Sequence, residues 1–350
     1  MGWTVEDISS DLKELKRLFN EETNPSKKVE LADSIGRLER VLIGYSFDRK
    51  GPNISDANFF TCLDKFPSYR VQLPYVRDFI NSFKDLNIYL EIKDREVLHY
   101  TREEMDEMVH DFYKSVGGIY YDKFLEYDKE KVERVNYTQM PSSESALHVV
   151  PHLDKYYINI GTDSDDRDVI EALVHEIGHA LTFKINYKRY ESNKEFREIE
   201  ALFLELIADR YFAKTTNDQY FTDIEIFKII NYYKLSDLFD SIGTAYDLVL
   251  DNALNIEDPN KMFLKMVKDQ GIIKFPKKNV YSNMNYLFSY ICALELVEIY
   301  GEDKDKAMDI LTKIISNNDD VTEFERITEH ITPNRHVKKY VKELKKVNSD

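Results

Sequence analysis

The sequence has too few cysteines, glycines and prolines for several classes of protein. Its two cysteines, Cys62 and Cys292, can form neither a disulfide framework nor a four-sulfur metal site. Only 11 glycines and 9 prolines occur among 350 residues, which argues against a loop-rich or many-turned all-β fold. The longest uncharged stretch, residues 279–294, contains several asparagines and serines and is too short to cross a bilayer.

Negative charge dominates the chain. There are 64 acidic residues against 48 basic ones, for a formal net charge of −16. Such a field repels phosphate backbones and anionic lipids, so neither a nucleic acid nor a membrane is an expected partner. Residues 1–20 also lack the basic segment and apolar run of a secretory signal. We therefore expect a cytoplasmic protein, of an oligomeric state that the sequence does not indicate.

Hydrophobic spacing predicts a mainly α fold of the α+β class. Residues 1–45 have the helical period of a hairpin, and helical patterns recur after Pro74 and from residue 163 onward. Thr101 and Glu104 have the spacing of a capping box that opens another helix. Residues 132–160, in contrast, have the composition and alternation of strands. The pattern predicts a large helical body with one small β-sheet.

The chain shows no clear internal division. It contains no repeat, no low-complexity tract and no strong cluster of glycine and proline. We therefore expect one continuous fold, with an N-terminal mainly helical region at residues 1–130 and a second region at residues 131–350. The small sheet is expected next to the middle helices of this second region.

The strongest chemical signal is the pentad His175-Glu176-Ile177-Gly178-His179. Side chains four residues apart lie on one face of a helix, so the two imidazoles can present nitrogens to one zinc ion. Glu176 lies beside that face, where its carboxylate can reach a water molecule rather than the metal, as a general base requires. The pair also lies in an apolar part of its helix, where an unpaired charge is costly. The pattern predicts one Zn²⁺ ion bound by His175 and His179, with Glu176 as a catalytic residue.

A zinc hydrolase needs a third protein ligand, and the next predicted helix, residues 192–215, offers several carboxylates. Glu205 is preferred because Asp209 follows one helical turn later on the same face. In that position Asp209 could accept the far N–H of His175 and fix its tautomer, while Glu205 binds the metal. Glu198 is the alternative ligand. It lies nearer the turn between the helices but has no acidic partner four residues on.

The segment HEIGHAL, followed by a glutamate on the next helix, resembles the gluzincin metallopeptidases. The similarity is greatest to the thimet oligopeptidase and oligoendopeptidase F family, whose members are usually much longer. This resemblance implies a mainly helical peptidase with a deep channel, one zinc ion and cleavage of short peptides. Residues 198–205 also resemble the family's glutamate segment in a different register, which would make Glu198 the ligand.

The same resemblance extends to a tyrosine-rich segment at residues 285–300. In the family, a tyrosine or histidine from this late helical segment donates a hydrogen bond to the oxyanion that forms during hydrolysis. Such a donor stabilises negative charge opposite the attacking water. Tyr286 and Tyr290, four residues apart, are the positions that match best.

Together these features predict a zinc metallopeptidase whose catalytic region is residues 131–350. Glu176 would take a proton from water and pass it to the leaving amine. An extended peptide substrate would pair with the edge of a strand at residues 146–150 or 156–160. Two alternatives remain open: a zinc protease that acts on a specific protein substrate, and a non-catalytic binding protein that metal stabilises.

Overall fold

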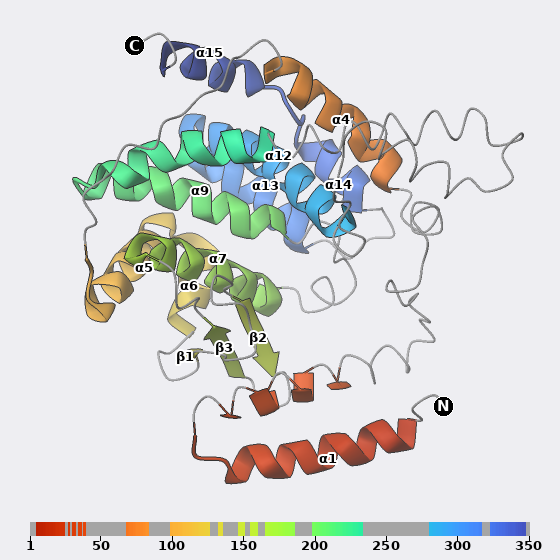
Figure 1. Cartoon of the computed structure of the whole chain (residues 1–350). Coiled ribbons are helices and arrows are strands. Elements are labelled where there is room, and N and C mark those ends of the chain that lie inside the picture. Colours follow the sequence, from red (N-terminus) through yellow and green to blue (C-terminus); the bar gives the residue numbers. More distant parts are fainter. Residues whose placement is uncertain are drawn as a thin grey trace, which may run out of the picture. The chain divides into compact units, whose positions relative to one another are not determined.

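The computed structural model is mainly α, as the sequence predicts (Figure 1). The structure describes residues 5–24, 27–28, 30–32, 34–36, 38–39, 68–83, 99–126, 132–135, 146–150, 155–159, 165–185, 198–233, 280–316 and 323–347. Within these ranges, no helix combines the length and the apolar character that crossing a bilayer requires.

Two compact units make up the chain, and each is built from separate segments. The first unit comprises residues 1–51, 96–192 and 208–218, and the second comprises residues 52–95, 193–207 and 219–350. Helix α9 (Glu198–Thr215) is shared between them, because its residues up to 207 belong to the second unit and the rest to the first. The division expected near residue 130 coincides with none of these boundaries and stays a prediction.

Three helices of the first unit pack against one another: α5 (Arg102–Val116), α6 (Gly118–Glu126) and α7 (Asp166–Ile185). The predicted capping box is confirmed at the start of α5. The Glu104 N–H donates to Thr101 Oγ1 at 3.2 Å, and Glu104 Oε2 accepts from the Thr101 N–H at 2.7 Å. The helix ends at Gly117, whose φ of 69° lies in the left-handed region that favours glycine.

A three-stranded sheet lies beside α7 in the same unit. It consists of β1 (Val132–Val135), β2 (Ala146–Val150) and β3 (Lys155–Asn159), in the order β1-β3-β2. The central strand β3 pairs parallel to β1 and antiparallel to β2. Both β2 and β3 contact α7, and Ile158 of β3 is completely buried. The segment with strand-like composition therefore forms a sheet next to the helix that carries the pentad.

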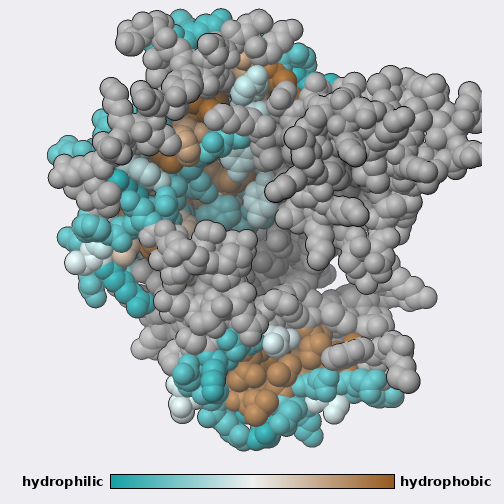
Figure 2. Space-filling view, in the orientation of Figure 1, coloured by the Kyte–Doolittle hydropathy of each residue, from teal (hydrophilic) through white to brown (hydrophobic). Residues whose placement is uncertain are grey.

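The N-terminal segment forms a helical hairpin. Helix α1 (Val5–Glu21) and the described helical residues between 27 and 39 share a core of Leu12, Phe19, Ala32 and Ile35. The amphipathic spacing explains this pairing, because each helix has one apolar stripe to bury. Figure 2 shows hydrophobic side chains gathered on the surface of this hairpin. A groove of the hairpin is lined by Leu18 and Leu31 together with charged and polar side chains.

In the second unit, α12 (Val280–Glu302) is buried on all sides over residues 287–298. It contacts α4 (Ser68–Phe83) and α13 (Lys304–Ser316). Helix α13 in turn contacts α14 (Glu323–His330), and α15 (Val337–Val347) contacts α4. A helix that is apolar around its whole circumference is expected at the centre of such a bundle.

Two carboxylates interrupt the apolar surface of α12, and both bind the C-terminal segment. Glu295 accepts the N–H of His336 at 2.7 Å, and its second oxygen lies 2.8 Å from His336 Nδ1. Glu298 accepts from the Tyr340 hydroxyl at 2.8 Å and pairs with Lys339. Burial raises the pKa of Glu295, and the hydrogen bonds from His336 oppose this shift.

The start of α4 differs from the sequence-based expectation. A helix was expected after Pro74, but α4 begins at Ser68 and continues through this proline. Proline lacks the N–H that would bond to the carbonyl of residue 70. Pro74 is exposed, so water can satisfy that carbonyl, while Val76 and Phe79 are buried and hold the helix in place.

Candidate metal centre

Helix α7 carries the pentad, and its first turn is anchored by charged side chains. Asp165 precedes the helix and accepts the Arg167 N–H at 2.8 Å, while Asp166 and Asp168 suit the positive end of the helix dipole. Arg167 Nε donates to Asp218 at 2.6 Å, and both side chains are only 4% exposed. The hydroxyl of Tyr100 donates to the same carboxylate. This network fixes the end of α7 that lies two turns before the pentad.

The two histidines share one face of α7, as their spacing predicts. Their ring centroids lie 4.8 Å apart and the rings are almost perpendicular, at 87°. His179 and Glu176 are buried, with exposed fractions of 7% and 8%, and His175 is half-buried. Buried polar rings at this position require partners that satisfy their nitrogens.

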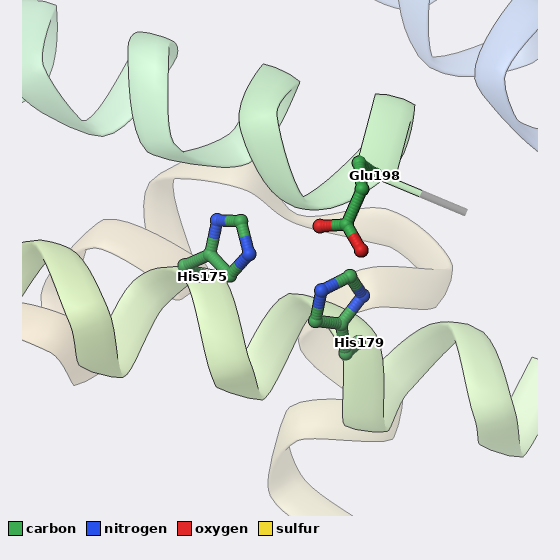
Figure 3. A group of neighbouring side chains, drawn as sticks. All are labelled: His175, His179 and Glu198. Atoms are coloured by element: carbon green, nitrogen blue, oxygen red, sulfur yellow. The ribbon is translucent and has the colours of Figure 1, made fainter. Parts of the chain in front are cut away.

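The structure brings Glu198 to this pair of histidines. One ligand atom from each of His175, His179 and Glu198 lies within 4.8 Å of the other two. Figure 3 shows the two rings projecting from α7 and the Glu198 carboxylate, in the first turn of α9, directed toward them. Glu198 is only 3% exposed. The group therefore contains the carboxylate that the sequence offered as the alternative ligand.

Glu205, the preferred ligand in the sequence-based prediction, has a different partner. Its Oε1 lies 2.7 Å from Nζ of Lys228, and the two side chains are 15% and 12% exposed. Glu205 follows Glu198 by seven residues, so the two carboxylates lie on one face of α9, about two turns apart along the helix axis. The group around the histidines therefore includes Glu198 and not Glu205. Asp209, one turn further on, is completely buried, and its predicted bond to His175 stays a prediction.

The sequence did not single out Tyr232, a tyrosine whose pKa responds to the charges of both Glu205 and Glu198. It lies in the helical stretch 219–233, one turn after Lys228. Burial raises the pKa of Tyr232, and the negative charges of Glu205 and Glu198 raise it further, while Lys228 opposes them. The signal available in the sequence was the spacing of Lys228 and Tyr232, which places both on one helix face.

The two tyrosines predicted as oxyanion donors lie on α12 in unequal environments. Tyr286 is half-buried, whereas Tyr290 is completely buried. The ring of Tyr290 stacks on that of Tyr232, with centroids 3.7 Å apart and planes 9° from parallel. Burial raises the pKa of Tyr290 well above its ordinary value. Their role in catalysis stays a prediction, which the exposure favours for Tyr286 over Tyr290.

The donor set of the group fits a divalent metal ion. Two imidazole nitrogens and one carboxylate oxygen form the ligand set of many catalytic zinc sites, in which the fourth position remains open. The acidic side chain adds the negative charge that a dication prefers, and the imidazoles bind in their neutral form. His175, His179 and Glu198 could therefore hold a metal ion, with Glu176 on the turn of α7 between the two histidines.

Comparisons with known proteins found similar solved structures but no related sequence. No protein-family profile and no curated protein matches the sequence. The structure is similar to that of a protein assigned as an oligoendopeptidase F from Bacillus anthracis str. Ames, with a TM-score of 0.47 and 14% identity. That match covers 98% of this chain and 64% of the other.

Two further structures give the same result. PZ peptidase A, solved with an inhibitor, has a TM-score of 0.47 and 15% identity over 97% of this chain and 67% of its own. A second structure of an assigned oligoendopeptidase F has a TM-score of 0.47 and 13% identity, over 97% and 66%. The chain thus spans about two thirds of the length of the structures that it resembles.

Proposed function

We propose that the protein is a zinc-dependent peptidase that hydrolyses peptide bonds in short peptides. The observation that carries this proposal is the grouping of His175, His179 and Glu198, with Glu176 in the same turn as the histidines. We assign Glu198 as the third ligand in place of Glu205, because Glu205 already pairs with Lys228.

The side chains of the pentad have distinct roles in this proposal. His175, His179 and Glu198 would hold the ion, and Glu176 would act as the general base without binding it. When bound, zinc polarises the scissile carbonyl and lowers the pKa of water into the range where a carboxylate can deprotonate it. Glu176 then accepts the proton of the attacking water and delivers it to the nitrogen of the leaving amine. Its burial, at 8% exposure, keeps bulk water from competing for that proton.

The charge of the ligand set also suits hydrolysis. Two neutral imidazoles and one carboxylate offset only one of the two positive charges of a divalent ion. With such an ion bound, the site would keep a net positive charge, which would favour negative charge on the carbonyl oxygen.

The sheet beside α7 offers a place for an extended peptide. Of the two strands considered from the sequence, β3 is paired on both sides and β2 has β3 as its one partner among the described strands. Because β2 also contacts α7, its outer edge is the surface where we expect a substrate backbone to pair. A substrate bound in this way would have to be extended, a conformation that a short peptide can adopt without unfolding.

The proposal is tested by replacing Glu176 with glutamine. The variant should still bind one zinc ion per chain, and its rate on a quenched fluorescent decapeptide library should fall about 100- to 10,000-fold. The matched control is Asp168→Asn, which removes an exposed carboxylate from the first turn of the same helix and should keep the wild-type rate.

Three results would overturn parts of the proposal. A Glu176→Gln variant that cleaves peptides at the wild-type rate would remove Glu176 as the base. A wild-type protein that binds zinc but cleaves neither decapeptides nor folded proteins would favour the non-catalytic alternative. Cleavage of a folded protein in preference to decapeptides would instead favour a protease with a specific protein substrate.

A further inference from the structure

A buried tyrosine of α5 donates a hydrogen bond to the helix that carries the pentad. The hydroxyl of Tyr113 lies 2.8 Å from the carbonyl oxygen of Val174, the residue immediately before His175. Tyr113 is completely buried. Its ring stacks on Phe124, with centroids 4.7 Å apart and planes 14° from parallel, and meets the edge of Phe112 at 5.1 Å. These contacts fix the direction of the hydroxyl.

The carbonyl that receives this bond lies one turn before Gly178, the one glycine of α7. In an α-helix the carbonyl of Val174 also accepts the N–H of residue 178, which here is Gly178. Glycine is among the least favourable residues in a helix interior, because it loses the most backbone freedom on folding. The glycine lies between the two proposed metal ligands. A second hydrogen bond to the same carbonyl therefore supports α7 where its own sequence supports it least.

We propose that Tyr113 is a positioning residue, whose hydrogen bond to the Val174 carbonyl holds the turn of α7 that presents His175 and Glu176. The inference rests on the proposed function, because positioning matters only if those side chains act on a metal and a water molecule. Most metal sites contain groups that do not bind the metal but hold its ligands in position, and loss of such a group weakens metal binding without removing a ligand. Burial raises the pKa of Tyr113 well above its ordinary value, so the hydroxyl keeps its proton and remains a donor.

A purely structural role for Tyr113 predicts a different outcome, and the chain offers a control that separates the two. Tyr120 of α6 is also completely buried and belongs to the same unit, but the hydrogen bond to Val174 comes from Tyr113. Changing either tyrosine to phenylalanine removes one buried hydroxyl and keeps the ring. If only general stability matters, Tyr113→Phe and Tyr120→Phe should have similar effects on the site.

The experiment compares wild type, Tyr113→Phe and Tyr120→Phe in two measurements that need no catalysis. Zinc affinity is measured by competition with a chromophoric chelator, and backbone hydrogen exchange of residues 174–179 is measured by mass spectrometry on the metal-free protein. We expect about tenfold weaker zinc binding and faster exchange for Tyr113→Phe, with values close to wild type for Tyr120→Phe. In peptide cleavage, kcat of Tyr113→Phe should fall while KM stays near the wild-type value.

Wild-type zinc affinity and exchange in Tyr113→Phe would overturn the inference, as would equal losses in both variants. Failure of the proposed function gives a different pattern, in which the wild-type protein cleaves no peptide. The two zinc and exchange measurements still decide the role of Tyr113 in that case.

Discussion

Replacing Glu205 by glutamine should destabilise the protein without weakening zinc binding, whereas the same change at Glu198 should weaken zinc binding severely. The two residues lie two turns apart on one helix and carry the same functional group. Their partners differ, because Glu198 lies within 4.8 Å of the histidine ligand atoms and Glu205 lies 2.7 Å from Lys228. The comparison therefore separates a metal ligand from a structural ion pair.

The size of the Glu205 effect follows from the burial of its pair. Two unit charges 2.7 Å apart attract each other by about 6 kcal/mol at an effective dielectric constant of about 20. The desolvation of both groups offsets part of this attraction, and removing one member of a buried pair typically costs 3–5 kcal/mol. Because both side chains retain slight exposure, at 15% and 12%, we expect a loss of about 3 kcal/mol for Glu205→Gln. Adding Lys228→Met should recover most of this loss, because it removes the unpaired ammonium group.

Urea unfolding of the metal-free variants measures the first effect, and chelator competition measures the second. Zinc affinity should fall by more than about 100-fold for Glu198→Gln, since loss of a ligand exceeds the 10- to 100-fold cost of losing an outer partner. It should change by less than about threefold for Glu205→Gln. The reverse pattern, with Glu205→Gln deficient in zinc and Glu198→Gln normal, would refute the assignment of the third ligand.

Three further predictions concern other parts of the structure. Arg167→Met should lower the free energy of unfolding in urea by about 3–5 kcal/mol, because it removes the cation that offsets the buried charge of Asp218, and adding Asp218→Leu should restore much of it. Burial raises the pKa of Glu295 above its ordinary 4.5, so the folded state keeps this proton to a higher pH than the unfolded chain does. The stability advantage of wild type over Glu295→Gln should therefore shrink as pH rises from about 4 to 6, and an advantage that grows would contradict this. Tyr286→Phe should lower kcat by about 100-fold if its hydroxyl stabilises the oxyanion, whereas Tyr290→Phe should keep the wild-type kcat because Tyr290 is completely buried. Equal losses of kcat would show that burial does not exclude Tyr290 from the reaction.

The features that could be predicted from the sequence are those that local spacing determines. The pentad had to place two histidines on one helix face, because residues four apart always lie so in an α-helix. The capping box at Thr101 and Glu104 is likewise a property of four consecutive residues, and it forms as predicted. The strand-like composition of residues 132–160 also led to the correct segment, since alternation and β-branched residues suit a half-buried sheet.

The third ligand could not be chosen in this way. Glu198 and Glu205 share a face of α9, so helical spacing treats them as equivalent. The choice depends on which turn of α9 lies opposite the histidines and on Lys228, which follows Glu205 by 23 residues and enters through tertiary packing alone. The acidic partner of Glu205 at position 209, which favoured it in the sequence, is completely buried one turn further along the helix. Similarly, the tyrosine pattern of α12 could not show that Tyr290 is buried against Tyr232, because that ring comes from another helix.

The most direct test of the metal site is anomalous diffraction at the zinc absorption edge from crystals of the zinc-loaded protein. We predict a single strong peak bounded by the rings of His175 and His179 and the carboxylate of Glu198. A peak coordinated by Glu205 in place of Glu198, or no peak beside the two histidines, would contradict the assignment.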